Sequence, residues 1–285
     1  FYATTFSRMH EVKTLGGNLY GIRMAASSDH NLLTHVRIHG ATRDGLRLHT
    51  LKNSQFIDIS VTLNGEAGIF GGFQINSNEF IRVRASGNGF TNGGHGFRFG
   101  GSGNILHNII SSNNEYDALG SLLGAGLMIQ GDESKDNVVT RFTGFNNRNP
   151  GLHITGSNAT NTLSNLTVAN SRDRSGLQIG YADGGRVNNA VSLHNNLSGI
   201  YANSNASGML WNDLVAVHNL TNGVQLTSAN NNTFTGLLVV GDNGGMNCRL
   251  DTAGSMPGLI APQCTDSGAD GSSTYTGQSS TAVLS

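Results

Sequence analysis

Several features that commonly identify a protein class are scarce or missing in this sequence of 285 residues. Charged residues make up only 12% of the chain, the net charge is −1 and no basic run is present, which argues against a nucleic-acid-binding protein. No stretch approaches the roughly 18 consecutive apolar residues of a membrane span. No signal peptide is recognisable, although a mature or excised domain would have lost one. The apolar residues show no sustained helical period, so helices are not expected.

Proline and cysteine are also rare, with three and two residues, whereas the chain has 40 glycines. The glycines lack the triplet period of collagen and suit a chain with many tight turns. Cys248 and Cys264 both lie near the C-terminus, and a disulfide between them would constrain the unfolded chain by roughly 3 kcal/mol. We expect this disulfide and therefore an oxidising compartment; the alternative is two free thiols in a reducing one.

What the sequence does contain is a tandem repeat of ten units, most of them 23 or 24 residues long. Each unit has an apolar anchor and a second apolar residue three positions later. Most units then have an Asn, and a glycine follows with two alternating apolar residues after it. The anchors are Phe6, Leu33, Phe56, Phe80, Leu106, Val139, Leu163, Val187, Trp211 and Phe234. The Asn residues are Asn64, Asn88, Asn114, Asn147, Asn195 and Asn219, and the repeat glycines are Gly21, Gly45, Gly72, Gly96, Gly126, Gly151, Gly176 and Gly223.

The spacing within each unit predicts short strands joined by tight turns, because Asn, Gly and Ser tolerate positive φ or bond their own backbone. Two to three short strands per unit leave no room for crossover helices, so parallel strands require a chain that winds as a coil and stacks on itself. With about 4.8 Å between coils, ten coils make a rod about 45–50 Å long. The Asn series is expected to bond from coil to coil as a ladder. Over roughly residues 5–243 the repeat resembles the right-handed parallel β-helix repeat family.

This family includes pectate lyases, polygalacturonases, alginate epimerases, phage tailspikes and bacterial surface adhesins, so the resemblance specifies a fold rather than a function. We expect an all-β, right-handed parallel β-helix of about ten coils in residues 1–243. Residues 244–285 are expected to form a C-terminal extended segment that contains the disulfide and packs on the helix or reaches a partner. A β-helix end exposes unpaired strand edges, so a cap and residues before Phe1 are expected in a parent protein.

Alternate side chains of the strand after each repeat glycine are expected to point outward and form a polar stripe with almost no carboxylate. The stripe comprises Arg23, Arg47, His49, Gln74, Asn76, Arg98, Met128, Gln130, His153, Thr155, Gln178, Tyr201, Asn203, Gln225 and Thr227. The candidate ligand-binding residues on it are Arg47, His49, Gln74, Asn76, Gln130, Gln178 and Asn203. We expect a polysaccharide or a cell-surface glycan as the partner, on the analogy of the fold.

Candidate catalytic residues on the stripe are Arg98, His153 and Tyr201. Glycoside hydrolysis needs two carboxylates that face one bond, and the stripe has no such pair. A lyase or epimerase needs a cation for the uronate carboxylate, a base for the C5 proton and an acid for the leaving oxygen, which these three side chains could supply. The Asp-Pro-His-Glu or Asp-Pro-His-Asp motif of the alginate epimerases is absent, however. His153 and Tyr201 are also two units, roughly 10 Å, apart.

An insertion makes the unit between Leu106 and Val139 longer than the others, at 33 residues. Its extra residues fall in 113–126 and are followed by the acidic segment 131–136. Glu115, Tyr116 and Asp117 are candidate ligand-binding residues there, and with Asp132, Glu133, Lys135 and Asp136 they are expected to gather near Arg98 and His153. No cofactor is predicted; a Ca²⁺ site is conceivable from these oxygens, and the alternative is a solvated turn. His95 is either a site residue or a turn histidine.

A second stripe, on the strand that contains the second apolar residue, is expected to turn apolar in the later units. Its outward residues are Phe145, Val191, Leu193, Val215, Val217, Leu238 and Val240, where earlier units have Arg37, His39, Arg84 and Ser86. A contiguous apolar stripe is costly in water, so either the C-terminal segment covers it or it is a subunit interface.

Together these features predict an extracellular or cell-surface β-helix module that binds glycans or acts as an adhesive or structural rod. The alternative is a polysaccharide lyase or epimerase that acts on an acidic, uronate-containing glycan. Neither hypothesis involves nucleic acid or a membrane span, and a homo-oligomer or a larger parent chain is compatible with both.

Overall fold

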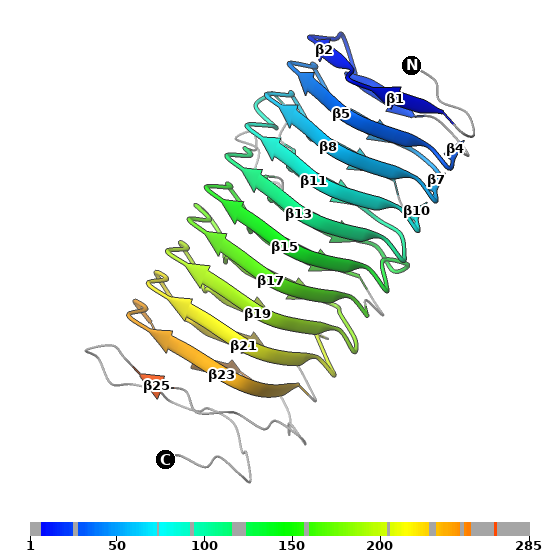
Figure 1. The fold of residues 1–285 in the computed structure, drawn as a ribbon. Coiled ribbons are helices and arrows are strands. Elements are labelled where there is room, and N and C mark those ends of the chain that lie inside the picture. Colours follow the sequence, from blue (N-terminus) through cyan, green and yellow to red (C-terminus); the bar gives the residue numbers. More distant parts are fainter. Residues whose placement is uncertain are drawn as a thin grey trace.

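The computed structural model describes residues 7–24, 28–72, 74–91, 94–115, 124–156, 160–203, 206–227, 232–245, 248–251 and 265–266. Within these ranges the chain winds as a coil of parallel strands that stack into a rod, with the two termini at opposite ends (Figure 1). The described elements are all strands, which confirms the all-β prediction. Among the described residues no helix is long and apolar enough to cross a membrane.

Each coil contributes one long strand to a sheet that we call the long-strand sheet. Its strands are β1 (Arg8–His10), β2 (Lys13–Leu15), β5 (Leu32–His39), β8 (Gln55–Thr62), β11 (Glu79–Ser86), β13 (Ile105–Ser112), β15 (Val138–Phe145), β17 (Thr162–Ala169), β19 (Arg186–Leu193), β21 (Leu210–Val217), β23 (Thr233–Gly241) and β25 (Thr265–Asp266). Every neighbouring pair in this sheet is parallel, as a stacked coil requires.

A second sheet, the short-strand sheet, lies behind the first in Figure 1 and has ten strands, one per coil. They are β3 (Ile22–Met24), β6 (Leu46–Leu48), β9 (Ile69–Gly71), β12 (Phe97–Phe99), β14 (Leu127–Gln130), β16 (Leu152–Thr155), β18 (Leu177–Gly180), β20 (Ile200–Ala202), β22 (Val224–Thr227) and β24 (Cys248–Asp251). Three two-residue strands, β4 (Ser28–Asp29), β7 (Leu51–Lys52) and β10 (Ile75–Asn76), form a small third sheet. The prediction of a parallel β-helix of about ten coils is therefore confirmed.

The long strands bend at their fourth residue, which takes a left-handed conformation with φ between 51° and 56° in eight of them. These residues are His35, Asp58, Arg82, Asn108, Arg141, Asn165, Asn189 and Asp213. The second, fifth and seventh residues of these strands face the core, whereas the fourth is exposed in six of the eight and half-buried at Asp58 and Asn108. Asn and Asp are the non-glycine residues that adopt this conformation most readily, which explains most of the column.

The anchors found in the sequence form the core. Phe56 and Phe80 stack with ring centroids 4.7 Å apart, and Trp211 and Phe234 stack at 5.8 Å. All described anchors from Leu33 to Phe234 are at most 5% exposed; Phe6 lies outside the described residues. Since every coil covers the apolar side chains of the next, the core is one continuous column rather than a central cluster.

The predicted Asn ladder is present and explains the repeat glycines. Asn88 Nδ2 donates to Asn114 Oδ1 at 3.0 Å, and the same bond recurs from Asn64 to Asn88, Asn114 to Asn147 and Asn195 to Asn219. A Cβ added to Gly68 would lie 2.7 Å from Asn88 Nδ2, and Gly45, Gly96, Gly126 and Gly176 face the amide nitrogens of the ladder in the same way. Asn and Gly are thus one packing unit, because the amide column occupies the space that a side chain would need.

A second Asn ladder, which the sequence analysis missed, lies at the turns before strands β11, β13, β15 and β17. Asn78 donates to Asn104, Asn104 to Asn137 and Asn137 to Asn161, at 2.9 to 3.1 Å. These buried amides also donate to turn carbonyls, as Asn104 does to the oxygen of Ile75. Their signal was the recurring Asn two positions before the anchor.

Two register predictions were wrong. The repeat glycine of the third unit is Gly68, not Gly72, because strand β9 comes directly after Gly68 and places Phe70 outward. In strand β23 the pairing shifts after Asn212, so Val239 pairs with Val215 and Val240 is buried. The shift in β23 is of one residue, which reverses the side-chain direction in the rest of that strand.

The described part of the C-terminal segment continues the coil. Strand β24 pairs with β22, and strand β25 pairs with β23 at the end of the long-strand sheet. The segment between them, with Cys264, lies outside the described residues, so the disulfide with Cys248 stays a prediction. Nothing described lies across the later apolar stripe, whose residues Val191, Leu193, Val215 and Val217 are half-buried.

Candidate functional site

One outward side chain from every strand of the short-strand sheet forms a column along the rod, which we call the outer ladder. The backbone register places Arg23, Arg47, Phe70, Arg98, Met128, His153, Gln178, Tyr201, Gln225 and Arg249 on successive coils. This confirms that the predicted stripe is continuous, with Phe70 in the place assigned to Gln74. Neighbouring members are separated by the interstrand spacing of about 4.8 Å.

The N-terminal part of the outer ladder is a stack of cations and an aromatic ring. The guanidinium carbon of Arg47 lies 3.9 Å from the ring centroid of Phe70, and that of Arg98 lies 5.2 Å from it on the next coil. The ring face attracts both cations and fixes their orientation. Sequence analysis missed Phe70 because it placed the repeat glycine four residues late.

Arg98 is further held by Gln130, a predicted site residue. When the Gln130 amide is oriented with its oxygen towards Arg98, this oxygen accepts hydrogen bonds from Arg98 Nη2 at 2.6 Å and from Arg98 Nε at 3.0 Å. Burial lowers the pKa of Arg98, with Arg47 opposing protonation and Asp44 favouring it. The guanidinium stays charged at neutral pH and is poorly solvated, so an anion beside it would gain more than at an exposed arginine.

Two carboxylates, also missed by the sequence analysis, lie beside this stack on the turns that enter the short strands. Asp44 is 1% exposed, accepts from Arg47 Nη1 at 2.6 Å and accepts from the backbone N–H of Ala67 at 3.1 Å. Burial raises the pKa of Asp44, and the hydrogen bond from Arg47 opposes this rise. Glu66 accepts from Arg43 Nε at 2.8 Å. Their position just before a repeat glycine was the available signal.

Tyr20 completes the N-terminal end of this cluster. The guanidinium carbons of Arg23, Arg43 and Arg47 lie 5.6, 5.7 and 5.6 Å from its ring centroid. Three cations surround this ring, and two of them, Arg47 and Arg43, form ion pairs with Asp44 and Glu66. A carboxylate-bearing ligand has cations on either side of Phe70 to contact.

The three predicted catalytic residues are on the outer ladder but do not converge. Arg98 and His153 are separated by Met128, and His153 and Tyr201 by Gln178, so each pair is two coils, about 10 Å, apart. His153 is only 5% exposed, and burial lowers its pKa to about 4, with Arg174 as a lesser cause. The imidazole is therefore neutral at pH 7 and a weak base.

Two other predicted histidines have different surroundings. His95 is 1% exposed, and its Nδ1 accepts from the backbone N–H of Ala125 at 3.2 Å. Burial holds the pKa of His95 well below the ordinary histidine value, so it is a neutral turn histidine and not a ligand-facing residue. His49 is half-buried at the end of strand β6, and burial followed by the charges of Arg23 and Arg47 lowers its pKa.

The remaining predicted binding residues are spread over the short-strand face and the turn beyond it. Gln74 lies in an exposed turn, where its Oε1 accepts from Thr50. Asn76 belongs to the third sheet and accepts from the backbone N–H of Ser102 at 2.8 Å. Gln178 is half-buried on the outer ladder, and Asn203 follows strand β20 with its Oδ1 buried and unbonded among the described residues. Gln74 and Asn76 are thus off the outer ladder, because the register there was wrong.

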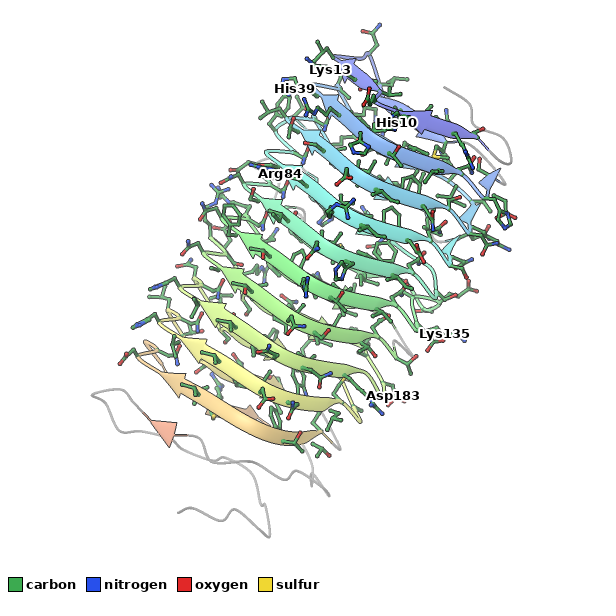
Figure 2. The ribbon with its side chains drawn as sticks, in the orientation of Figure 1. His10, Lys13, His39, Arg84, Lys135 and Asp183 are labelled. Atoms are coloured by element: carbon green, nitrogen blue, oxygen red, sulfur yellow. The ribbon has the colours of Figure 1, made fainter. Side chains whose placement is uncertain are left out.

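The inserted loop does not gather its charges at one place. Glu115 lies on the turn that enters the short-strand sheet, where it forms an ion pair with Arg172. Residues 131–136 follow strand β14 and therefore lie at the opposite end of this short strand from Glu115; Lys135 is labelled in Figure 2. Tyr116 and Asp117 lie outside the described residues. In the described ranges no group of three or more His, Cys, Asp or Glu side chains is placed to hold a metal ion.

No protein-family model matches the chain, and no curated protein matches it. Among solved structures it is similar to the periplasmic alginate epimerase AlgG, with 12% identity and a TM-score of 0.58 over 82% of this chain and 55% of that one. It is also similar to pectate lyase Pel9A, with 12% identity and a TM-score of 0.53 over 87% of this chain and 68% of that one. The chain thus spans about half the length of the alginate epimerase, and identity this low shows the fold alone. With its stacked parallel coils, the chain has the parallel β-helix fold.

Proposed function

We propose that this protein is an extracellular or cell-surface module that binds a linear acidic polysaccharide along the N-terminal part of its outer ladder. The observation that carries the proposal is the stack of Arg47, Phe70 and Arg98 on three successive coils. The structural neighbours named above, an alginate epimerase and a pectate lyase, support a glycan-related role. Their reported names and the predicted disulfide also support a location outside the cytoplasm.

The stack suits a chain of uronate sugars that lies along the rod. Guanidinium groups bind carboxylates through two parallel hydrogen bonds, and Arg98 is pre-oriented for this by Phe70 and Gln130. Arg23 and Arg47 are one coil spacing apart, about 4.8 Å, and Arg47 and Arg98 are two apart, about 10 Å, so a linear polymer along the rod meets these cations in turn. Phe70 supplies an apolar surface for a sugar ring between the two cations.

Binding without cleavage is supported by the layout of the acid–base groups. Arg98, His153 and Tyr201 are too far apart to act on one sugar ring, and His153 is covered. A general base must come within hydrogen-bond reach of the proton that it removes, and a side chain this buried does not reach a ligand on the surface.

A lyase or epimerase remains the second candidate, because of Asp44. The pKa of this carboxyl is raised by burial, and it lies beside Arg47 and the Tyr20 ring. A carboxyl of raised pKa next to a cation is a combination that proton abstraction uses. Asp44 is only 1% exposed, however, so this candidate requires its turn to open when the polymer binds. This centre differs from the one predicted from the sequence around His153.

One incubation tests both candidates. Alginate, pectate, a glycosaminoglycan and neutral dextran are each mixed with the protein, and bound protein and ultraviolet-absorbing unsaturated uronate are measured in the same samples. We expect binding to at least one acidic polymer, none to dextran and no product. Arg98→Gln should weaken binding about tenfold or more, because a poorly solvated charged contact is lost.

Arg186→Gln is the matched control, since Arg186 is exposed on the long-strand sheet far from the outer ladder. Equal losses for the two variants would contradict the proposed site. Unsaturated product that disappears in Asp44→Asn would support the lyase instead, and exchange of the C5 proton with solvent deuterium tests the epimerase.

A further inference from the structure

The long-strand sheet, on the side of the rod opposite the outer ladder, has its own concentration of cations. Lys13, His39 and Arg84 project from the N-terminal half of this sheet in Figure 2. Five of the 17 lysines and arginines of the chain, Lys13, Arg37, Arg82, Arg84 and Arg141, line two pockets there. Neither the predicted stripe nor the outer ladder contains any of these residues.

The two pockets join into one trough that crosses several coils. The first, of about 620 Å³, includes Lys13, Arg37 and Arg84, and the second, of about 490 Å³, includes Arg84 and Arg141. They share Arg82 and Arg84, so they are continuous. We call the hollow lined by these two sets of residues the basic trough. The basic trough runs along the bend of the long strands. The left-handed fourth residues of these strands form one side of it, and their outward sixth residues form the other.

One side of the basic trough is already neutralised within the protein. Arg82 donates to both oxygens of Asp58, at 2.6 and 2.8 Å, and His35 Nε2 lies 3.5 Å from the same carboxylate. These residues belong to the column at the bend, where Asp58 lies between His35 and Arg82 on the neighbouring coils. The column gives the trough a rigid wall and leaves little of its charge for a ligand.

The other side has cations without anions. Lys13 pairs in register with Arg37, Arg37 with Ser60, and Ser60 with Arg84, so three cations lie on four successive coils. Like charges directly opposite each other on neighbouring strands are unfavourable. In the part of the chain that the structure describes, no ion pair involves Lys13, Arg37 or Arg84 on this side, or Arg141 in the column at the bend, and all four are exposed.

We propose that the basic trough is a second, independent binding site for a linear acidic polysaccharide. Its unpaired cations recur at one-coil and two-coil spacings along the rod axis, which matches a polymer with one carboxylate or sulfate on each sugar. The ligand removes the repulsion between Lys13 and Arg37 by neutralising both. With the outer ladder on the opposite side, the module then holds two polysaccharide chains at once.

The lining favours a polysaccharide over a nucleic acid. No phenylalanine, tyrosine or tryptophan is among the described residues that line the trough, whereas single-stranded nucleic acids are held by stacking on such rings. The net charge of the chain is −1, so no long-range attraction draws in a duplex. The carbons of Val12 and Ile110 give the trough apolar patches for sugar rings.

Arginine footprinting with phenylglyoxal, followed by mass spectrometry, tests the proposal on the whole chain. The protein is modified alone and with saturating alginate, pectate, heparin, neutral dextran or a single-stranded oligonucleotide. We expect an acidic polysaccharide to protect Arg37 and Arg84 from modification and to leave Arg186 unprotected, and dextran to protect none of them. Arg98 in the same spectrum reports the outer ladder, so failure of one site is distinguished from failure of the other.

A charge-removing variant provides the second arm. Arg37→Gln/Arg84→Gln should weaken binding to the protecting polysaccharide roughly 3- to 20-fold and lower the slope of log affinity against log salt by up to about two, whereas Arg186→Gln should change neither. Unprotected Arg37 and Arg84 under every polymer would overturn the proposal. Stronger protection by the oligonucleotide than by any polysaccharide would overturn the ligand class.

Discussion

At the scale of single residues, burial decides which polar side chains are available for a ligand. His95 and His153 have the residue type that chemistry uses, yet both are buried and neutral. Arg47 and Arg98 are held against Phe70 and keep their charge at the surface of the short-strand sheet. The residues that matter for binding are therefore the oriented cations rather than the histidines.

The depressed pKa of His153 predicts a pH-dependent stability. Its folded pKa of about 4 lies below the ordinary 6.5, so between these values the unfolded chain binds more protons than the folded one. The stabilisation is present above pH 6.5 and is lost as the pH falls towards 4, by about 3 kcal/mol for this group. Denaturant unfolding at pH 7, 5.5 and 4, a range that reaches down to the folded pKa of about 4, should show a flatter dependence of stability on pH in His153→Gln. Parallel curves for this variant and wild type would show that His153 titrates normally in the fold.

Phe70 gives a sharper test of the cation stack than either arginine. Phe70→Leu keeps an apolar side chain but removes the ring face, so Arg47 and Arg98 lose their common support. We expect about threefold to tenfold weaker binding of an acidic polysaccharide, with Phe70→Tyr close to wild type. Titration calorimetry measures this, and thermal unfolding checks that both variants are folded. Unchanged binding in Phe70→Leu would mean that the arginines are positioned without the ring.

At the scale of the repeating elements, two columns of buried amides hold the turns. Each internal Asn accepts from the preceding coil and donates to the next, so loss of one member leaves polar groups unbonded on both sides. The first ladder is interrupted at Ser171, whose backbone N–H donates to Asn195 while its hydroxyl accepts from Gly151. The fold therefore tolerates the shorter Ser side chain here, because its hydroxyl and backbone N–H make hydrogen bonds to Gly151 and Asn195.

This contrast predicts unequal costs along the ladders. Asn104→Ala removes a side chain that accepts from Asn78 and donates to Asn137 and to the oxygen of Ile75. We expect it to lower the free energy of unfolding by about 2–4 kcal/mol, against about 1 kcal/mol for Ser171→Ala, where one hydrogen bond is lost. Urea unfolding monitored by circular dichroism measures both. Similar costs would show that the second ladder carries no more stability than the interruption in the first.

The periodic features could be predicted from the sequence, and the contacts between non-equivalent positions could not. The anchors, the first Asn ladder and the coil fold follow from a constant unit length, because every coil repeats the same local choice. Phe70 was missed because Gly68 and Gly72 are both followed by apolar residues, so either could be the repeat glycine. Only the pairing of Phe70 with Arg47 in the structure shows that it is Gly68. The bond between Arg98 and Gln130 joins coils whose connecting turn has an inserted loop, so no fixed spacing reveals it.

At the scale of the whole molecule, the rod presents its charge in two rows rather than as a net field. The chain as a whole carries −1, but the outer ladder and the basic trough each place cations at coil spacing on one side of the N-terminal half. The later coils have Val191, Leu193, Val215 and Val217 half-buried at the outward positions of the long-strand sheet instead. Binding is therefore expected at the N-terminal half.

A linear arrangement of contacts predicts a dependence on ligand length. Arg23 and Arg98 are three coil spacings apart, about 14 Å, so a uronate oligosaccharide should bind more tightly with each added sugar until it spans this distance. Calorimetry with uronate oligosaccharides of increasing length, in the Arg37→Gln/Arg84→Gln background, isolates the outer ladder. Equal affinity of a monosaccharide and a long oligosaccharide would indicate a single compact pocket.

The most direct test of the central claim is the paired measurement of binding and unsaturated product with an acidic polysaccharide, for wild type and Arg98→Gln. The account predicts that wild type binds the polymer and releases no unsaturated uronate, and that Arg98→Gln binds it about tenfold more weakly. Ultraviolet absorbance that rises with time would contradict it by showing a lyase. Binding that Arg98→Gln leaves unchanged would contradict it by placing the ligand away from the outer ladder.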